Sequence, residues 1–148
     1  GLAYDILVFE RQLPSAIALA DRHPDQVLVL DHVAKPRIRD GLLEPWRERM
    51  RELARRPNVC CKLSGMVTEA DHRAWSAAQL RPYVETVIEA FTPERLMLGS
   101  DWPVCLLACD YGRWIDTVRG FLGGLSPAEQ AQILGGTARR AYRLDGTP

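Results

Sequence analysis

Two ionisable side chains stand directly behind apolar segments that are typical of buried strands. Asp101 ends the segment 95–101, RLMLGSD, and His32 ends the segment 26–32, QVLVLDH. A carboxylate at the rim of a buried strand, with Trp102 beside it to limit water, can act as a general base or a metal ligand. An imidazole in the same position can bind a metal or polarise a substrate carbonyl. Each has a structural alternative, because aspartate is common at helix starts and turns, and a lone histidine is often a core residue.

Four further residues near these positions are candidates for binding a substrate: Lys35, Lys62, Ser64 and Trp102. Lys62 lies in the otherwise apolar segment CCKLSG, where a buried charge needs a partner, so substrate-anion recognition and a structural ion pair both remain open. Ser64 falls on the same side of that segment, two residues on. Lys35 is either a substrate contact or a solvated loop lysine. Asp31 should point away from His32 in a strand, and we expect it to be structural.

These residues are positioned by an alternation of strands and helices. Short apolar runs predict strands over 3–9, 26–32, 58–65 and 95–101. Amphipathic patterns and proline stops predict helices over 13–24, 45–57, 80–91, 111–124, 126–136 and 137–144. The resulting order, β-α-β-α-β-α-β followed by helices, indicates parallel strands covered on both faces.

Polar residues stand near the carboxyl end of each predicted strand, from Glu10 in the first to Asp101 in the last. Parallel strands place their carboxyl ends at one edge, where α/β proteins bind ligands. A doubly wound sheet and a (β/α)8 barrel both satisfy this pattern, and they differ in strand number. No composition break divides the chain, so we treat 1–148 as one domain.

Composition excludes several classes of function. Nineteen basic residues balance nineteen acidic ones, which gives no electrostatic reason to expect a nucleic acid or an anionic membrane partner. No apolar run approaches membrane-spanning length, and no basic leader stands at the start. The four cysteines lack zinc-site spacing and are expected to be reduced thiols of a cytoplasmic protein. Dinucleotide, P-loop, GxSxG and HExxH motifs are absent, and we assign no catalytic role to His23 or His72.

Four segments together resemble the amidohydrolase superfamily: DHVAKP, CKLSGMVTEA, RLMLGSDWPVCLLA and ILGGTARRAYRL. The likeness is to the branch that contains sugar-acid lactonases of the L-fuconolactonase and L-rhamnonolactonase types and the pyrone-dicarboxylate lactonase. It implies an α/β fold, the C-terminal half of a TIM-like (β/α)8 barrel with about four parallel strands. It also implies hydrolysis of a small sugar-acid or carboxylated lactone by activated water, in carbohydrate metabolism, with or without a divalent metal such as Zn or Mn.

The resemblance also implies roles for individual residues. Asp101 takes the place of a last-strand aspartate that serves as general base or metal-linked proton acceptor, and His32 that of a histidine that contacts metal or substrate carbonyl. Both are therefore candidate metal ligands. Cationic side chains at the same mouth would hold a carboxylate or hydroxyls of the small-molecule substrate.

One feature of that family is missing from the sequence. Its members begin with a strand that carries His-x-His, whereas the histidines here are His23, His32 and His72. Together with the absence of an initiator Met, this leads us to expect that residues upstream are missing. We expect the isolated chain to be nearly inactive, and either to pair with the missing N-terminal half or to self-associate. A metal-dependent decarboxylase of the same superfamily, and an inactive fragment or interaction module, remain alternatives.

Overall fold

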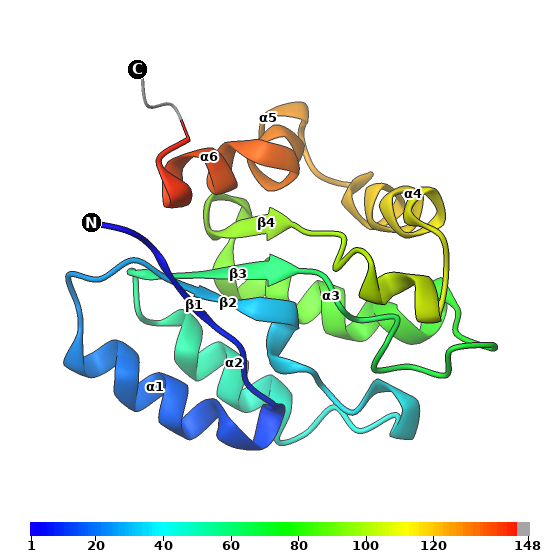
Figure 1. Cartoon of the computed structure of the whole chain (residues 1–148), viewed down its shortest axis with the longest axis horizontal. Helices are drawn as coiled ribbons and strands as arrows, with labels where there is room; N and C mark the ends of the chain where they lie inside the picture. The colour runs from blue at the N-terminus through cyan, green and yellow to red at the C-terminus, as the bar shows by residue number, and fades with distance from the viewer. Residues whose placement is uncertain (145–148) are drawn as a thin grey trace.

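The computed structural model describes residues 1–144, which form one parallel sheet with the strand order β1-β2-β3-β4 (Figure 1). The strands are β1 (Tyr4–Ile6), β2 (Leu28–Leu30), β3 (Val59–Leu63) and β4 (Leu96–Leu98). The helices are α1 (Leu13–Arg22), α2 (Trp46–Ala54), α3 (Ala77–Phe91), α4 (Tyr111–Leu122), α5 (Pro127–Ala131) and α6 (Thr137–Tyr142). The predicted element order and parallel pairing are confirmed. Each strand is shorter than predicted, because the chain leaves the sheet for irregular or 3-10 segments.

The sequence predicts two separate helices over 126–136 and 137–144, but the structure joins them into one continuous run. A π-helical stretch, Gln132–Gly136, joins α5 to α6 without a break. Gly136 has φ −57° and ψ −45°, which is ordinary right-handed helical geometry. The glycine pair therefore accompanies a widened turn instead of a helix end. The predicted start is confirmed, since Ser126 and Glu129 form a capping box with Pro127 in the first turn.

The two faces of the sheet have different neighbours, and β3 shows this most clearly. Its residues alternate between fully buried and half-buried, with Val59, Cys61 and Leu63 buried. That buried face belongs to the main core, which includes side chains of α1, α2 and α3. The opposite face carries a smaller cluster in which Met97 packs with Ala141 of α6. In Figure 1, α1 and α2 lie on one side of the sheet, and α5 and α6 lie on the other.

Within residues 1–144, each outer strand of the sheet is paired on one side only, β1 with β2 and β4 with β3. Large apolar side chains are exposed in the chain segments that hold or follow the two outer strands: Leu2, Tyr4, Leu7 and Phe9 in and around β1, and Trp102, Val104, Leu106, Leu107 and Tyr111 after β4. A closed barrel of this type has eight strands and no such edges. The described residues therefore form an open half-barrel with apolar rims.

Two smaller predictions are also tested by the structure. All four cysteines are free thiols. Within residues 1–144, no helix combines the length and the apolar character needed to cross a membrane.

Candidate functional site

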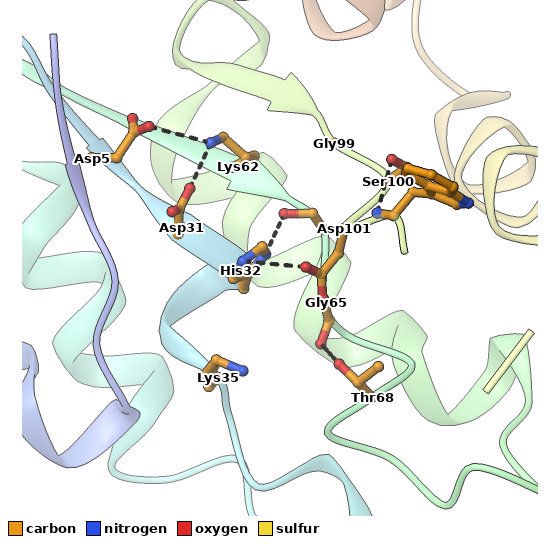
Figure 2. A network of polar contacts seen from close by, with 12 residues as sticks. Asp5, Asp31, His32, Lys35, Lys62, Gly65, Thr68, Gly99, Ser100 and Asp101 are labelled. Carbon is orange, nitrogen blue, oxygen red and sulfur yellow. Dashed lines mark hydrogen bonds and ion pairs between the residues drawn. The ribbon is translucent and has the colours of Figure 1, made fainter. Parts of the chain in front are cut away.

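A left-handed turn follows β2 and carries the first candidate residue. Four consecutive residues have φ angles between 46° and 59°: His32, Val33, Ala34 and Lys35. This conformation costs an L-residue roughly 1–2 kcal/mol, so the run needs tertiary contacts to persist. Val33 and Ala34 are fully buried, and Trp46 Nε1 donates a 2.7 Å hydrogen bond to the Val33 carbonyl. The turn ends the strand and leaves His32 beside the end of β3 (Figure 2).

The end of β3 supplies the surface on which the imidazole lies. Ser64 is fully buried, and its Oγ lies 2.8 Å from His32 Nδ1. Gly65 follows with φ 62°, and a Cβ at this position would lie 2.7–2.8 Å from Cγ, Cβ and Nδ1 of His32. Carbon atoms do not approach so closely without displacing one another. Glycine at position 65 therefore makes room for the ring.

Asp101 completes this arrangement from the end of β4. Its φ of 57° is also left-handed, and the Asp101 carbonyl accepts a 2.9 Å hydrogen bond from the Cys105 amide. Asp101 Oδ1 lies 3.6 Å from His32 Nε2, and the two side chains are only 12% and 16% exposed. Because β3 separates β2 from β4, the imidazole spans the end of β3 to reach the carboxylate (Figure 2). The structure thus brings the two principal candidates together.

The surroundings of His32 favour its neutral form. Burial is the largest influence and lowers the pKa of His32, and the charges of Asp101 and Asp31 oppose this only in part. Lys35 and Lys62 lower the pKa further. A neutral imidazole can offer either a lone pair or an N–H from Nε2.

Lys62 belongs to a separate polar cluster on the half-buried face of the sheet. Its Nζ lies 2.6 Å from Asp31 Oδ1 and 3.9 Å from Asp5 Oδ2. Tyr142 Oη in α6 donates a 2.6 Å hydrogen bond to Asp5 Oδ1, and Lys62 Nζ lies 5.6 Å from the centre of the Tyr142 ring. Burial opposes the charge on Lys62, but Asp31 and Tyr142 outweigh it and raise the pKa of Lys62. Of the two roles left open by the sequence, an ion pair is present, and it also accounts for Asp31.

The remaining predicted binding residues lie at the same edge. Lys35 Nζ forms a 2.8 Å ion pair with Glu69 and lies 5.8 Å from the centre of the Phe9 ring. Trp102 is 64% exposed, and its backbone amide donates to Ser100 Oγ at 3.2 Å. Within the part of the chain that the structure describes, the side chains of Lys35 and Trp102 make no hydrogen bond to the side chain of His32 or Asp101. The backbone amide of Lys35 donates a 2.8 Å hydrogen bond to the His32 carbonyl.

Three other polar residues lie outside this group. Glu10 falls in a 3-10 turn, Glu10–Gln12, beyond the end of β1. His23 follows α1, before β2 begins, and His72 Nε2 lies 3.0 Å from the Thr68 carbonyl oxygen in an exposed loop.

The pair formed by His32 and Asp101 fits part of a metal site. Two ligands of one tetrahedral zinc ion, each about 2.1 Å from it, lie roughly 3.4 Å apart. The observed separation of 3.6 Å between Nε2 and Oδ1 is close to that value. Residues 1–144 contain no group of three or more His, Cys, Asp or Glu side chains placed to hold an ion. The described residues thus offer two candidate ligands, and a complete metal site would need further ligands from elsewhere.

One protein-family model covers almost the whole chain. It is described as Amidohydrolase, and it matches residues 1–144. The chain belongs to the amidohydrolase family. The resemblance inferred from its four segments is confirmed.

Similar amidohydrolases extend this assignment. An L-fucono-1,5-lactonase of Burkholderia multivorans is 48% identical over 151 residues, which is 95% of this chain and 51% of that protein. An L-fucono-1,5-lactonase of Burkholderia ambifaria is 44% identical and covers 97% of this chain and 51% of that protein. A crystal structure of a Burkholderia multivorans amidohydrolase with bound zinc has a TM-score of 0.92 at 46% identity, covering 95% of this chain and 52% of that chain. The chain therefore spans about half the length of the relatives it matches, as the half-barrel prediction requires.

Several residues that build this amidohydrolase site are not evident from the sequence. Gly65 has the clearest signal, a glycine at the last position of a predicted strand, which is typical of a close approach or a positive φ. Trp46 supports the left-handed turn from a distant helix, and Glu69 pairs with Lys35 from another loop. These contacts join segments far apart in the chain, so local patterns do not reveal them.

Proposed function

We propose that this chain forms the catalytic C-terminal half of an amidohydrolase that hydrolyses a sugar-acid lactone such as a 1,5-lactone. The observation that carries the proposal is the 3.6 Å contact between His32 Nε2 and Asp101 Oδ1 at the carboxyl edge of the sheet. The L-fucono-1,5-lactonase relatives, at 48% and 44% identity, support the substrate class. Four free cysteines fit a reducing compartment, and we assign the protein to the cytoplasm.

A divalent metal is part of this proposal. His32 Nε2 and Asp101 Oδ1 would hold it, and the zinc-bound amidohydrolase at 46% identity makes zinc the first ion to test, with manganese the second. Such an ion would polarise the lactone carbonyl and lower the pKa of water. The ligands still needed would come from the other half of the barrel.

The residues of this chain then divide the chemistry between them. Asp101 takes a proton from the attacking water, so that a C–O bond forms at the lactone carbonyl. The ring C–O bond then breaks, and Asp101 returns the proton to the departing alkoxide, which yields the open hydroxy acid. His32 orients the substrate carbonyl or an ion at Nε2. Lys35, Lys62, Ser64 and Trp102 remain candidates for contacts to substrate hydroxyls or a carboxylate, with Lys35 and Trp102 at the mouth.

The open edges of the sheet suggest that this chain needs a partner that covers them in order to be active. Exposed apolar side chains beside β1 and beyond β4 favour burial against a further half-barrel. We propose that the partner is an N-terminal amidohydrolase half, which supplies four more strands and the missing ligands. A second copy of this chain is the competing occupant, and neither a nucleic acid nor a membrane is expected as a partner.

The test expresses residues 1–148 alone and together with the N-terminal half of the Burkholderia multivorans lactonase as a separate chain. Each sample receives Zn²⁺ or Mn²⁺, a panel of sugar-acid lactones, and a panel of aromatic acids. We expect the chain alone to be nearly inactive and the pair to release acid from lactones. Asp101→Asn should lower this rate about 10²–10⁴-fold with the fold intact.

Three outcomes would contradict the proposal. Turnover by the isolated chain that Asp101→Asn abolishes would show that no second half is needed. Carbon dioxide release from aromatic acids would favour a decarboxylase. A folded pair without activity on either panel, with either metal, would indicate an interaction module. Sedimentation analysis of the chain alone separates a dimer from a monomer.

A further inference from the structure

The hydroxyl of Ser64 has a restricted choice of partners. It is fully buried, and within residues 1–144 its hydrogen-bond partner is His32 Nδ1, at 2.8 Å. A serine hydroxyl can donate one hydrogen bond and accept others, whereas a neutral imidazole carries one N–H and one lone pair. The contact therefore has two possible forms, and they place the imidazole proton on different nitrogens.

The two forms differ at the atom that faces the carboxylate. If Ser64 donates to Nδ1, the imidazole proton is on Nε2 and points toward Asp101 Oδ1, 3.6 Å away. If Nδ1–H donates to Ser64, a lone pair on Nε2 faces a negative oxygen, and the buried hydroxyl proton has no acceptor among the described residues. Electrostatic attraction and the need to satisfy a buried donor both favour the first form.

We propose that Ser64 is a positioning residue that sets the tautomer of His32. In the metal-free chain its hydroxyl donates to Nδ1 and so keeps the proton on Nε2, where the imidazole presents an N–H toward Asp101. The ring has little room to tilt toward residue 65, where even a Cβ would lie 2.7–2.8 Å from it. An ion at Nε2 would need the opposite form, and the same hydroxyl provides it by rotating to accept from Nδ1–H.

The catalytic importance of this tautomer rests on the proposed function, but the tautomer itself can be measured without any turnover. His72 provides an internal reference in the same chain. Its Nε2 lies 3.0 Å from a carbonyl oxygen, which can only accept, so neutral His72 carries its proton on Nε2. His72 is exposed, so its Nδ1 resonance serves as the reference for a lone pair that is not bonded to a buried hydroxyl.

The experiment records long-range proton–nitrogen NMR spectra of the metal-free, ¹⁵N-labelled chain at a pH where the imidazoles are neutral. His32→Gln assigns the His32 signals. We expect His32 to show the same tautomer as His72, with its Nδ1 resonance shifted away from that of His72 in the direction caused by accepting a hydrogen bond. Ser64→Ala should move the Nδ1 resonance of His32 toward that of His72. Ser100→Ala, which removes a strand-end hydroxyl not bonded to the imidazole, should leave it unchanged.

Two results would overturn the inference. One is a proton on Nδ1 of His32 in the wild-type chain, which needs no variant and so stands even if Ser64→Ala fails to fold. The other is an unchanged Nδ1 resonance in a Ser64→Ala chain whose backbone amide spectrum shows the native fold. If both NMR results are as expected but the pair of half-barrels shows no lactonase activity, only the proposed function is contradicted.

Discussion

Gly65→Ala is the sharpest test of how the site is built. Alanine at a φ of 62° lowers the free energy of unfolding by roughly 1–2 kcal/mol, because left-handed backbone geometry is unfavourable for a residue with a Cβ. In addition, its Cβ would lie 2.7 Å from Cγ of His32, and relieving such an overlap in a packed site costs about 1–3 kcal/mol. We expect a total loss of about 2–5 kcal/mol in the free energy of unfolding, together with displacement of the imidazole from Ser64 and Asp101.

Gly41→Ala is the matched control for this substitution. Gly41 has a φ of 66°, and a Cβ there would meet no atom within 4 Å. Alanine at position 41 should therefore lower the free energy of unfolding only through the left-handed backbone, by roughly 1–2 kcal/mol. The difference between the two variants isolates the contact with His32, and we expect it to be about 1–3 kcal/mol.

Urea unfolding of the wild-type chain and the two variants measures both losses, provided that the slopes agree. The His32 Nδ1 resonance reports ring displacement independently, and it should shift in Gly65→Ala but not in Gly41→Ala. Equal losses in the two variants, with an unmoved His32 signal, would refute the account of Gly65 as the surface beneath the imidazole.

Two further predictions concern the polar cluster beside α6. Lys62→Met leaves Asp31 without its cation and should lower the free energy of unfolding, measured in urea, by roughly 1–3 kcal/mol. Adding Asp31→Leu to this variant should recover part of that loss. A double variant that is no more stable than Lys62→Met alone would argue against the ion pair. Burial and the hydrogen bond to Asp5 raise the pKa of Tyr142 to about 12 from an unfolded value of 10.0. Because the folded chain retains the phenol proton longer than the unfolded chain, stability should be unaffected below pH 10.0 and fall between pH 10.0 and about 12. Phenolate absorbance should show a late-ionising tyrosine that Tyr142→Phe removes, and an unchanged titration curve would contradict the shift.

The sequence predicts the framework of this molecule well. Apolar runs bounded by proline and glycine identify all four strands, and the amphipathic segments identify the helices. The carboxyl-edge rule then brings His32 and Asp101 to one place, and they lie 3.6 Å apart in the structure. Patterns of this kind succeed because they depend on which residues are buried, and that is encoded locally.

The details of the site follow from contacts that no local pattern encodes. Left-handed geometry is normally signalled by glycine or asparagine, yet the turn after β2 contains Val33, a β-branched residue for which positive φ is rare. Burial of Val33 and the hydrogen bond from Trp46 stabilise it. The predicted strands are too long because they include residues at the carboxyl ends, such as Asp31 and His32 after β2, where the backbone has already left the sheet. The fused α5–α6 run shows that even a glycine pair does not end a helix when its backbone stays right-handed.

The placement of His32 and Asp101 across three strands explains how this pair can form within the half-barrel alone. Neighbouring strands lie about 4.8 Å apart, so the ends of β2 and β4 are separated by roughly 9–10 Å, with β3 between them. A histidine can bridge that gap only if the intervening strand ends in residues that let the ring pass and hold it there, which Gly65 and Ser64 do. All three strand ends belong to one chain, so the His32–Asp101 pair does not depend on another polypeptide for its geometry. The proposed second half would therefore meet two candidate ligands that are already oriented, because folding of this chain has met the cost of ordering them.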